Sequence, residues 1–300
     1  MQKDYRQEMN KYHTSVLLQE VIELLNIGSG KKYIDATLGG GGHSFEILER
    51  GGIVLGLDVD QEALDYVKEN LKSQISNLKL KIAKGNFREI EKVAKENGFD
   101  KVSGIIFDLG VSGHQFDTPE RGFSFQKEGP LDMRMDKELK VAATDLVNAL
   151  TKGELYEIFF KLGEERFSRA IANGIIRARQ VSPIITTAEL WEIIRRSVPG
   201  NISGETGARI FQALRIVIND ELNNLKIALP QAFNLLDKEG KIAVISFHSL
   251  EDRIVKNQFA NWAEGGLGKL LTKKPVIPGR EEIEKNKRSR SAKLRVIEKL

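Results

Sequence analysis

The chain of 300 residues contains no cysteine. This absence excludes a disulfide framework, a thiolate zinc site, an iron–sulfur cluster and a catalytic thiol. The four histidines, His13, His43, His114 and His248, are widely spaced, so we expect no metal site. No stretch reaches the roughly eighteen apolar residues that a membrane span needs, and the first ten residues lack an apolar signal segment. We therefore expect a soluble, cytoplasmic protein with no membrane partner and no disulfide partner.

The net charge of +4 is unevenly distributed along the chain. Residues 269–300 contain eleven Lys or Arg and four Asp or Glu, a net charge of +7, so the remaining 268 residues carry −3. Such a basic tail is either a solvated surface or a contact for a phosphate backbone. Lys-Arg-Ser-Arg-Ser from Lys287 suits the second role, because small residues let the long cations spread. The charge alone does not decide between them.

Apolar bursts alternate with amphipathic stretches over the first 116 residues, which indicates a parallel sheet covered by helices. We expect strands at Tyr33 to Thr37, Ile53 to Leu57, Leu78 to Lys84 and Val102 to Phe107, with helices between them. The sheet pattern returns at Ile242 to Phe247 and at Leu294 to Ile297. The fold class is therefore α/β.

The segment between these two parts has the pattern of consecutive helices. We expect an inserted all-α domain at residues 118–206. Residues 1–117 and 207–300 together form the discontinuous α/β domain. Arg195 and Arg196 of the insertion are candidates for contacts with a nucleic acid, although surface arginines are usually only solvated.

Four consecutive glycines, Gly39 to Gly42, stand between the first expected strand and its helix. Glycine allows so tight a turn because it accepts positive φ and has no Cβ to keep a ligand off the backbone. Asp35 ends the strand before the turn, and Asp58 ends the second strand. An acidic side chain at this second place accepts hydrogen bonds from the ribose hydroxyls of an adenine nucleoside. The segment predicts a nucleoside pocket at the carboxyl edge of the sheet.

Three interpretations of this segment are open. It binds a nicotinamide dinucleotide, it binds S-adenosylmethionine, or it is a structural turn without a ligand. A dinucleotide fingerprint needs Gly-x-Gly-x-x-Gly, but counted from Gly39 the third glycine is replaced by Ser44. S-adenosylmethionine has no phosphate, and its cationic groups favour an acidic cleft. The arrangement Asp35-x-x-x-Gly39-x-Gly41 resembles the first motif of class I methyltransferases, which favours S-adenosylmethionine over a nicotinamide.

Asp108 ends the fourth expected strand, at the edge where open α/β folds hold ligands. Amine methyltransferases of class I carry Asp or Asn followed by Pro-Pro-aromatic here, whereas this chain reads Asp-Leu-Gly-Val-Ser. Asp108 is the candidate catalytic residue, with a turn cap as its alternative role. Phe247 and His248 follow the fifth strand beside it. They are candidates for packing against a target base, and Phe247 as a core residue is the alternative.

Several strings together resemble the ribosomal small-subunit RNA methyltransferase H family, also called MraW. They are HTSVLLQEV from His13, DATLGGGGHS from Asp35, DLGVS from Asp108, RGFSF from Arg121, GPLDMRMD from Gly129, FQALRIVIN from Phe211, SFHSLEDRIVK from Ser246 and RSAKLRVIEK from Arg290. The resemblance extends over nearly the whole chain. RGFSF with LDMRMD and SFHSLEDR makes it specific.

The resemblance implies a class I Rossmann-like enzyme that uses S-adenosylmethionine to methylate the exocyclic N4 of one cytidine in the decoding region of 16S rRNA, within the small ribosomal subunit. The cofactor contacts that it implies are Gly41, Gly42, His43, Asp58, Phe87, Asp108 and Gln115. The family usually reads Asp-Leu-Gly-Val-Ser-Ser-x-Gln. Here Gly113-His114 replaces the second serine and its neighbour, while Gln115 keeps its spacing from Asp108.

The missing cysteine bears on this chemistry. Methylation at C5 of cytosine needs a covalent cysteine adduct, whereas methylation at N4 or at an oxygen does not. We expect Asp108 to accept hydrogen bonds from N4 as it becomes tetrahedral. A nicotinamide-dependent oxidoreductase and a non-catalytic ribosome-binding protein are the alternative functions.

Overall fold

The computed structural model describes residues 14–72, 75, 77, 79–200 and 204–300. His13, the first residue of one motif, lies outside the described residues. So does Leu78, the first residue of one expected strand. The chain forms two compact units. Unit 1 combines Met1–Ser112 with Leu222–Leu300, and unit 2 is Gly113–Glu221. Unit 2 thus begins five residues before the expected insertion and ends fifteen residues after it.

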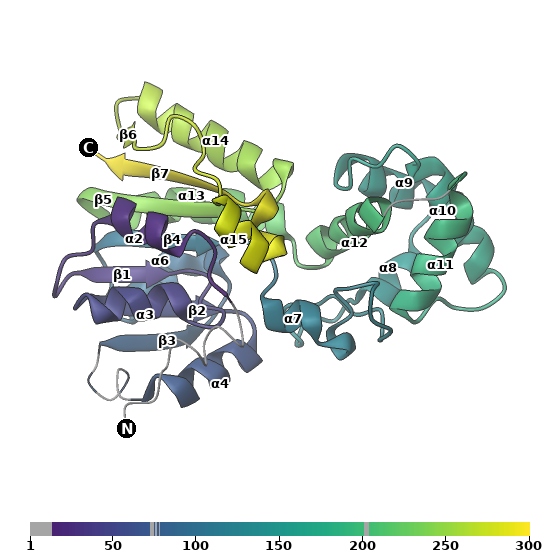
Figure 1. Ribbon diagram of the computed structural model, residues 1–300, viewed down its shortest axis with the longest axis horizontal. Coiled ribbons are helices and arrows are strands. Elements are labelled where there is room, and N and C mark those ends of the chain that lie inside the picture. The colour runs from purple at the N-terminus through teal and green to yellow at the C-terminus, as the bar shows by residue number, and fades with distance from the viewer. Residues whose placement is uncertain (1–13, 73–74, 76, 78, 201–203) are drawn as a thin grey trace. The chain divides into compact units, whose positions relative to one another are not determined.

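A seven-stranded sheet in the order β3-β2-β1-β4-β5-β7-β6 is the centre of unit 1 (Figure 1). The strands are β1 (Lys32–Asp35), β2 (Ile53–Asp58), β3 (Leu80–Lys84), β4 (Val102–Asp108), β5 (Leu236–Ser246), β6 (Gly268–Leu270) and β7 (Lys293–Lys299). The first five run parallel, and β7 pairs antiparallel with both β5 and β6. The expected α/β sheet is confirmed. β5 begins six residues earlier than expected, and β6 was not predicted because three residues carry no readable alternation.

Both faces of this sheet are covered, as its parallel strands require. Consecutive strand residues point to opposite faces: Ile34 belongs to one core cluster, and Tyr33 belongs to the other. The helices of unit 1 are α2 (Leu18–Leu25), α3 (Gly42–Glu49), α4 (Gln61–Asn70), η1 (Phe87–Glu89), α6 (Ile90–Glu96), α13 (Glu221–Leu235), α14 (Ser249–Glu264), α15 (Arg280–Lys285) and η3 (Lys287–Ser291). Val21 of α2 and Leu64 of α4 pack on the Tyr33 side. Leu229 of α13 packs on the Ile34 side.

Unit 2 is built from helices, and its described residues form no strand. The helices are α7 (Gly113–Asp117), η2 (Pro119–Arg121), α8 (Ala143–Ala149), α9 (Lys152–Lys161), α10 (Ser168–Arg179), α11 (Thr187–Ser197) and α12 (Gly204–Ile218). Capping boxes at Thr151 and Thr186 start α9 and α11. Helix α12 packs against α8, α9 and α11. These contacts explain why unit 2 extends well beyond residue 206.

The loop that carries RGFSF and LDMRMD is folded around Arg121, which is 3% exposed. Its guanidinium donates to the carbonyls of Arg134 and Met135. Gly122 follows with φ 70°, where a Cβ would lie 2.3 Å from the Pro130 carbonyl oxygen. The two motifs are therefore parts of one packed structure. Within the described residues, every helix is too short or too polar to span a bilayer.

Candidate active site

The glycine turn (residues 38–42) joins β1 to α3. Gly39 and Gly41 have φ angles of 50° and 80°, which favour glycine. The Gly41 N–H donates to the Leu38 carbonyl over 2.7 Å, which closes the turn. A Cβ on Gly42 would lie 2.0 Å from Oγ of Ser15. The predicted glycine turn is thus present, and Ser15 approaches it in a way that the sequence did not reveal.

Asp58, at the end of β2, supports the glycine turn. Its Oδ2 accepts from the Gly39 N–H over 2.8 Å, and its Oδ1 accepts from the Asp60 N–H over 2.9 Å. Loss of hydration raises the pKa of the Asp58 carboxyl to about 6, although both hydrogen bonds act in the opposite direction. Each oxygen of a carboxylate has a further lone pair. Asp58 can therefore also accept from ribose hydroxyls.

Asp35 lies beneath the same turn and is 1% exposed. Its Oδ2 accepts from the hydroxyl of Ser44 over 2.7 Å, and its Oδ1 accepts from the Thr37 N–H over 3.3 Å. Burial raises the pKa of Asp35, although His43 and these hydrogen bonds lower it. Because Ser44 belongs to the first turn of α3, this bond fixes the start of the helix against β1.

Asp108 ends β4 beside the glycine turn. Its N–H donates to Oγ1 of Thr37 over 2.6 Å. Its Oδ2 lies 3.8 Å from Nδ1 of His43, and both side chains are nearly buried. Nε2 of His43 is buried and has no hydrogen-bond partner within the described part of the chain. The structure therefore brings together Asp108, His43 and the glycine turn, as the sequence predicted, and it adds Thr37.

These side chains share one edge of the sheet. Strands β2, β1 and β4 are neighbours and run parallel, so Asp58, Asp35 and Asp108 all stand at the carboxyl edge. Open α/β sheets hold ligands at this edge. Three carboxylates, a turn with four glycines and a buried imidazole nitrogen without a partner among the described residues fit the cationic, phosphate-free S-adenosylmethionine. Asp58 would hold the ribose, and the turn with Asp108 would hold the remainder.

Phe87 and Phe247 flank the Asp108 strand at the same edge. The Phe87 ring, in η1 after β3, lies edge-on to Phe107 at 5.7 Å. A Cβ on Gly110 would lie 3.8 Å from Cδ2 of Phe247, so this ring borders the loop after Asp108. Phe247 also packs against the core cluster that contains Tyr33. Phe247 is thus near Asp108, as predicted, and is partly a core residue as well.

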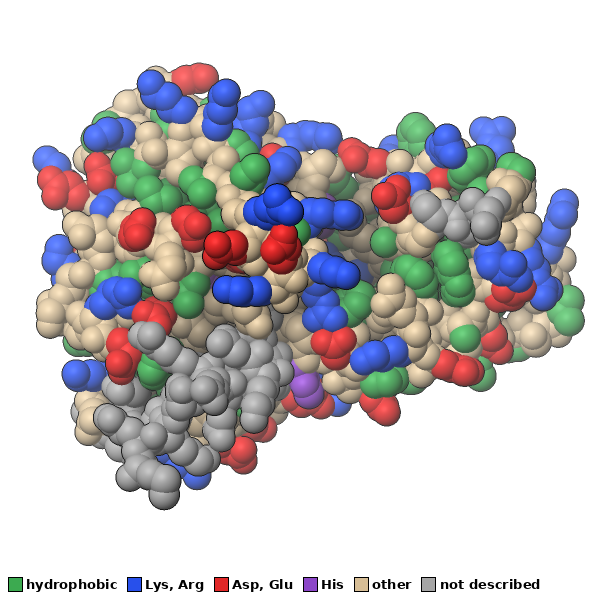
Figure 2. Space-filling view, in the orientation of Figure 1, with side chains coloured by type: hydrophobic (Ala, Val, Ile, Leu, Met, Phe, Trp, Pro, Cys, Tyr) green, Lys and Arg blue, Asp and Glu red, His purple; other side chains and the backbone are tan. Residues whose placement is uncertain are grey.

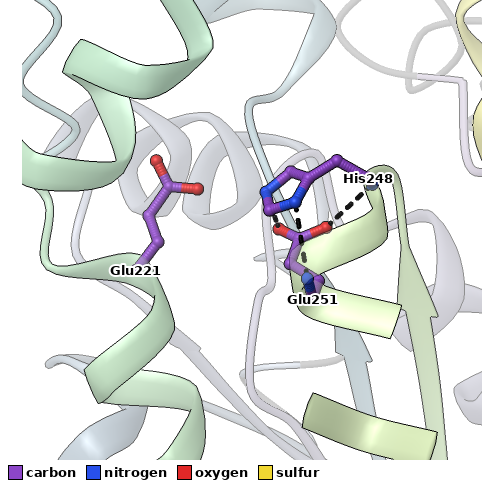
Figure 3. Close-up of side chains that lie close together, drawn as sticks. All are labelled: Glu221, His248 and Glu251. Carbon is purple, nitrogen blue, oxygen red and sulfur yellow. Dashed lines mark hydrogen bonds and ion pairs between the residues drawn. The ribbon is translucent and has the colours of Figure 1, made fainter. Parts of the chain in front are cut away.

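His248 caps helix α14. Its Nδ1 accepts from the Glu251 N–H over 3.4 Å, and its Nε2 lies 3.2 Å from Oε1 of Glu251 (Figure 3). Oε2 of Glu251 accepts from the N–H groups of Phe247 and His248. This reciprocal capping orders the chain immediately after β5. His248 therefore has a structural function, as the N-cap of α14, that was not predicted from the sequence.

The other candidate residues belong to unit 2. Gln115 lies in α7 and is 5% exposed. Arg195 and Arg196 lie at the end of α11, and both pair with Glu192. Arg195 does so through two hydrogen bonds of 2.8 Å. The pKa of Glu192 falls to about 2 because it accepts hydrogen bonds from both arginines.

Comparison with known proteins gives a consistent result. Residues 10–300 match the model of the MraW methylase family. Ribosomal RNA small subunit methyltransferase H of Carboxydothermus hydrogenoformans is 46% identical, over 96% of this chain and 98% of the relative. The protein of the same name from Brevibacillus brevis is 43% identical over the same shares. A crystal structure of an rRNA methylase from Streptococcus thermophilus, 10% identical, superimposes with a TM-score of 0.47 over 96% of this chain and 98% of that one. The chain belongs to the MraW methylase family.

Proposed function

We propose that this chain methylates the exocyclic N4 of a cytidine in the decoding region of 16S rRNA, with S-adenosylmethionine as the cofactor. Family membership and the name that these relatives share support this function. The observation that carries it is the shared edge at which the glycine turn, Asp58 and Asp108 meet. When bound, the cofactor supplies an electrophilic methyl group. The substrate is the rRNA within the small ribosomal subunit, in the cytoplasm.

The absence of cysteine argues against methylation at C5, and the family indicates N4 among the sites that remain. A chain without cysteine has no thiol to form the C6 adduct that C5 methylation needs. The N4 lone pair is delocalised into the ring, so the amine must be oriented and must lose a proton when it gains the methyl group. Asp108 accepts the hydrogen bonds of N4 and orients the amine. The adjacent His43 lies 3.8 Å away and adds a second site where a proton can be held.

The base itself must leave any helical stack to reach this edge. Phe247 borders the loop after Asp108 and offers a ring against which the base packs, a contact worth about 1 to 3 kcal/mol. His248 orders this segment by capping α14. The assignment of Phe247 rests on its position at the carboxyl edge, and that of His248 rests on its hydrogen bonds with Glu251.

Unit 2 supplies further contacts in this proposal. Gln115 keeps the spacing from Asp108 that the family motif has. The motif implies that Gln115 contacts the cofactor. Arg195 and Arg196 contact the RNA backbone. Their support is the exposed position of both side chains at the end of α11.

Two experiments test the function. Isothermal titration compares S-adenosylmethionine, S-adenosylhomocysteine and NADH, and we expect the first two alone to bind. Mass spectrometry of 16S rRNA from a strain that lacks this chain should show one cytidine without its N4 methyl group, restored by the wild-type gene. Binding of NADH alone, or an unchanged methylation pattern, would contradict the proposal.

A further inference from the structure

A turn rich in Lys and Arg lies at the same edge of unit 1 as the candidate active site. Strand β7 runs antiparallel to β5, and its first residue, Lys293, pairs with Ser246, the last residue of β5. β7 therefore begins at the carboxyl edge of the parallel strands. The basic turn, residues 285–291, ends with η3 and is separated from β7 by Ala292 alone. Asp58 and Asp108 end their strands at this edge too.

The backbone of the basic turn is firmly held. Ser289 is completely buried, and its N–H and hydroxyl both donate to the Asn286 carbonyl, over 3.0 and 2.8 Å. The Asn286 side chain accepts from the Arg288 N–H over 3.2 Å. Ala292 is 1% exposed, and its N–H donates to the Ser289 carbonyl. Ser289 and Ala292 are thus buried, whereas the cationic side chains of Lys287 and Arg290 are exposed.

Three cations of the basic turn have no acidic partner among the described residues. Residues 285–293 contain five Lys or Arg and no Asp or Glu. Lys285, Lys287 and Arg290 are exposed, and no carboxylate of a described residue pairs with them. Figure 2 shows Lys and Arg side chains gathered, with some acidic ones, over the part of unit 1 where Figure 1 draws α15.

Other cations of the basic tail serve the fold instead. Lys293 and Arg295 both pair with Asp252 of α14, over 3.2 and 2.6 Å. The Lys299 ammonium donates to the carbonyls of Phe233 and Leu236. The tail thus divides into a structural part in β7 and the basic turn, where no carboxylate of a described residue pairs with Lys285, Lys287 or Arg290.

The basic turn is also tied to the glycine turn. Oε1 of Glu282, in α15 just before the basic turn, accepts from the Leu17 N–H over 2.8 Å. Two residues before Leu17, Ser15 lies against Gly42 of the glycine turn. A ligand held by the basic turn is therefore held by the same compact unit as the candidate cofactor residues.

We propose that the basic turn binds the phosphodiester backbone of the RNA that carries the target base. The inference rests on the proposed function and specifies where its substrate docks on unit 1. Unpaired Lys and Arg side chains on a fixed backbone attract phosphates and release their counterions. A contact at the carboxyl edge positions the RNA so that one extruded base reaches Asp108.

The test compares two double charge reversals in the full chain. Lys287→Glu/Arg290→Glu alters the basic turn. Lys79→Glu/Lys238→Glu makes the same change in charge on exposed residues at the opposite edge, next to the starts of β3 and β5. The affinity for a 16S rRNA fragment is measured as a function of salt, and the affinity for S-adenosylhomocysteine is measured by titration calorimetry.

We expect the turn variant to bind the RNA fragment about tenfold or more weakly at ~0.1 M salt, with a slope of log K against log salt reduced by about 1 to 2. The control variant should stay within about twofold of the wild type, and both should bind S-adenosylhomocysteine normally. Equal losses of RNA affinity in the two variants would contradict the proposed docking surface alone. The same holds if the turn variant loses no affinity while the wild type methylates the fragment. A wild-type chain that neither binds nor methylates the fragment would overturn the proposed function as well.

Discussion

The N–H of Asp108 donates to the hydroxyl of Thr37 over 2.6 Å. This hydrogen bond joins the end of β4 to the residue that directly precedes the glycine turn. Thr37→Val keeps the shape of the side chain and removes the acceptor. We expect a loss of about 1 to 3 kcal/mol in the free energy of unfolding, because a half-buried N–H loses its partner. Thr37→Ser retains a hydroxyl and should lose much less. Denaturant unfolding of both variants measures the difference.

Asp108→Asn tests the role of the carboxylate in methyl transfer. We expect the turnover number to fall by about 10²- to 10⁴-fold, since an amide is a weaker acceptor for the N4 hydrogens. Single-turnover methylation of an RNA fragment measures the rate, and calorimetry measures the affinity for S-adenosylhomocysteine. Near-normal turnover with unchanged cofactor affinity would show that the carboxylate does not act on the amine.

Asp58 should make cofactor binding depend on pH. Its pKa of about 6 means that the carboxyl of the free protein is protonated in mild acid. The ribose hydroxyls donate to the carboxylate, so affinity should rise with pH through about 6 and fall about tenfold per unit below it. An adenine nucleoside without an amino-acid part is a suitable ligand, because it adds no titrating amine. In Asp58→Asn the affinity should be lower and nearly independent of pH over this range.

Gly122 and Gly200 provide a matched pair of substitutions within unit 2. Both have positive φ, 70° and 81°. A Cβ on Gly122 would lie 2.6 Å from the Asp132 nitrogen, whereas a Cβ on Gly200 would have no atom of a described residue within 4 Å beyond its chain neighbours. We expect Gly200→Ala to cost about 1 kcal/mol from backbone strain alone, and Gly122→Ala to cost at least about 3 kcal/mol. Similar unfolding midpoints for the two variants would contradict this account of the loop.

Substitution of Glu192 tests whether its two arginine partners contact RNA. Glu192→Gln removes the charge that Arg195 and Arg196 share. If these arginines contact RNA, affinity for a 16S rRNA fragment should rise a few-fold in this variant and fall about tenfold in Arg195→Glu/Arg196→Glu. Cofactor affinity should stay constant in both. Unchanged RNA affinity in both variants would remove the arginines from the interface.

The sequence was most informative where function depends on strand ends and glycines. Asp58 and Asp108 were located correctly because an apolar run identifies a buried strand and the next polar residue marks its end. The bond from Asp108 to Thr37 joins residues 71 positions apart, and no local pattern encodes it. The Asp35 to Ser44 bond was missed for a different reason, since a serine in the first turn of a helix has several equally ordinary partners.

Residues 207–236 illustrate a second limit, because their pattern is that of one long helix. The structure has α12 ending at Ile218 and α13 starting at Glu221, with Asp220 at a φ of 49° between them. Apolar periodicity continues across this break, so periodicity alone predicts one helix. The break matters for the fold, because it separates the helix that packs in unit 2 from the helix that covers the sheet.

The direction of β7 has a practical consequence for labelling. Near its far end, Glu298 is paired with Lys241, toward the amino ends of the parallel strands. A fluorophore or affinity handle attached beyond Lys299 thus emerges on the side of unit 1 opposite Asp58 and Asp108. Immobilisation through that end keeps the attachment point away from the carboxyl edge of the sheet, which suits surface-based measurements with ribosomal particles.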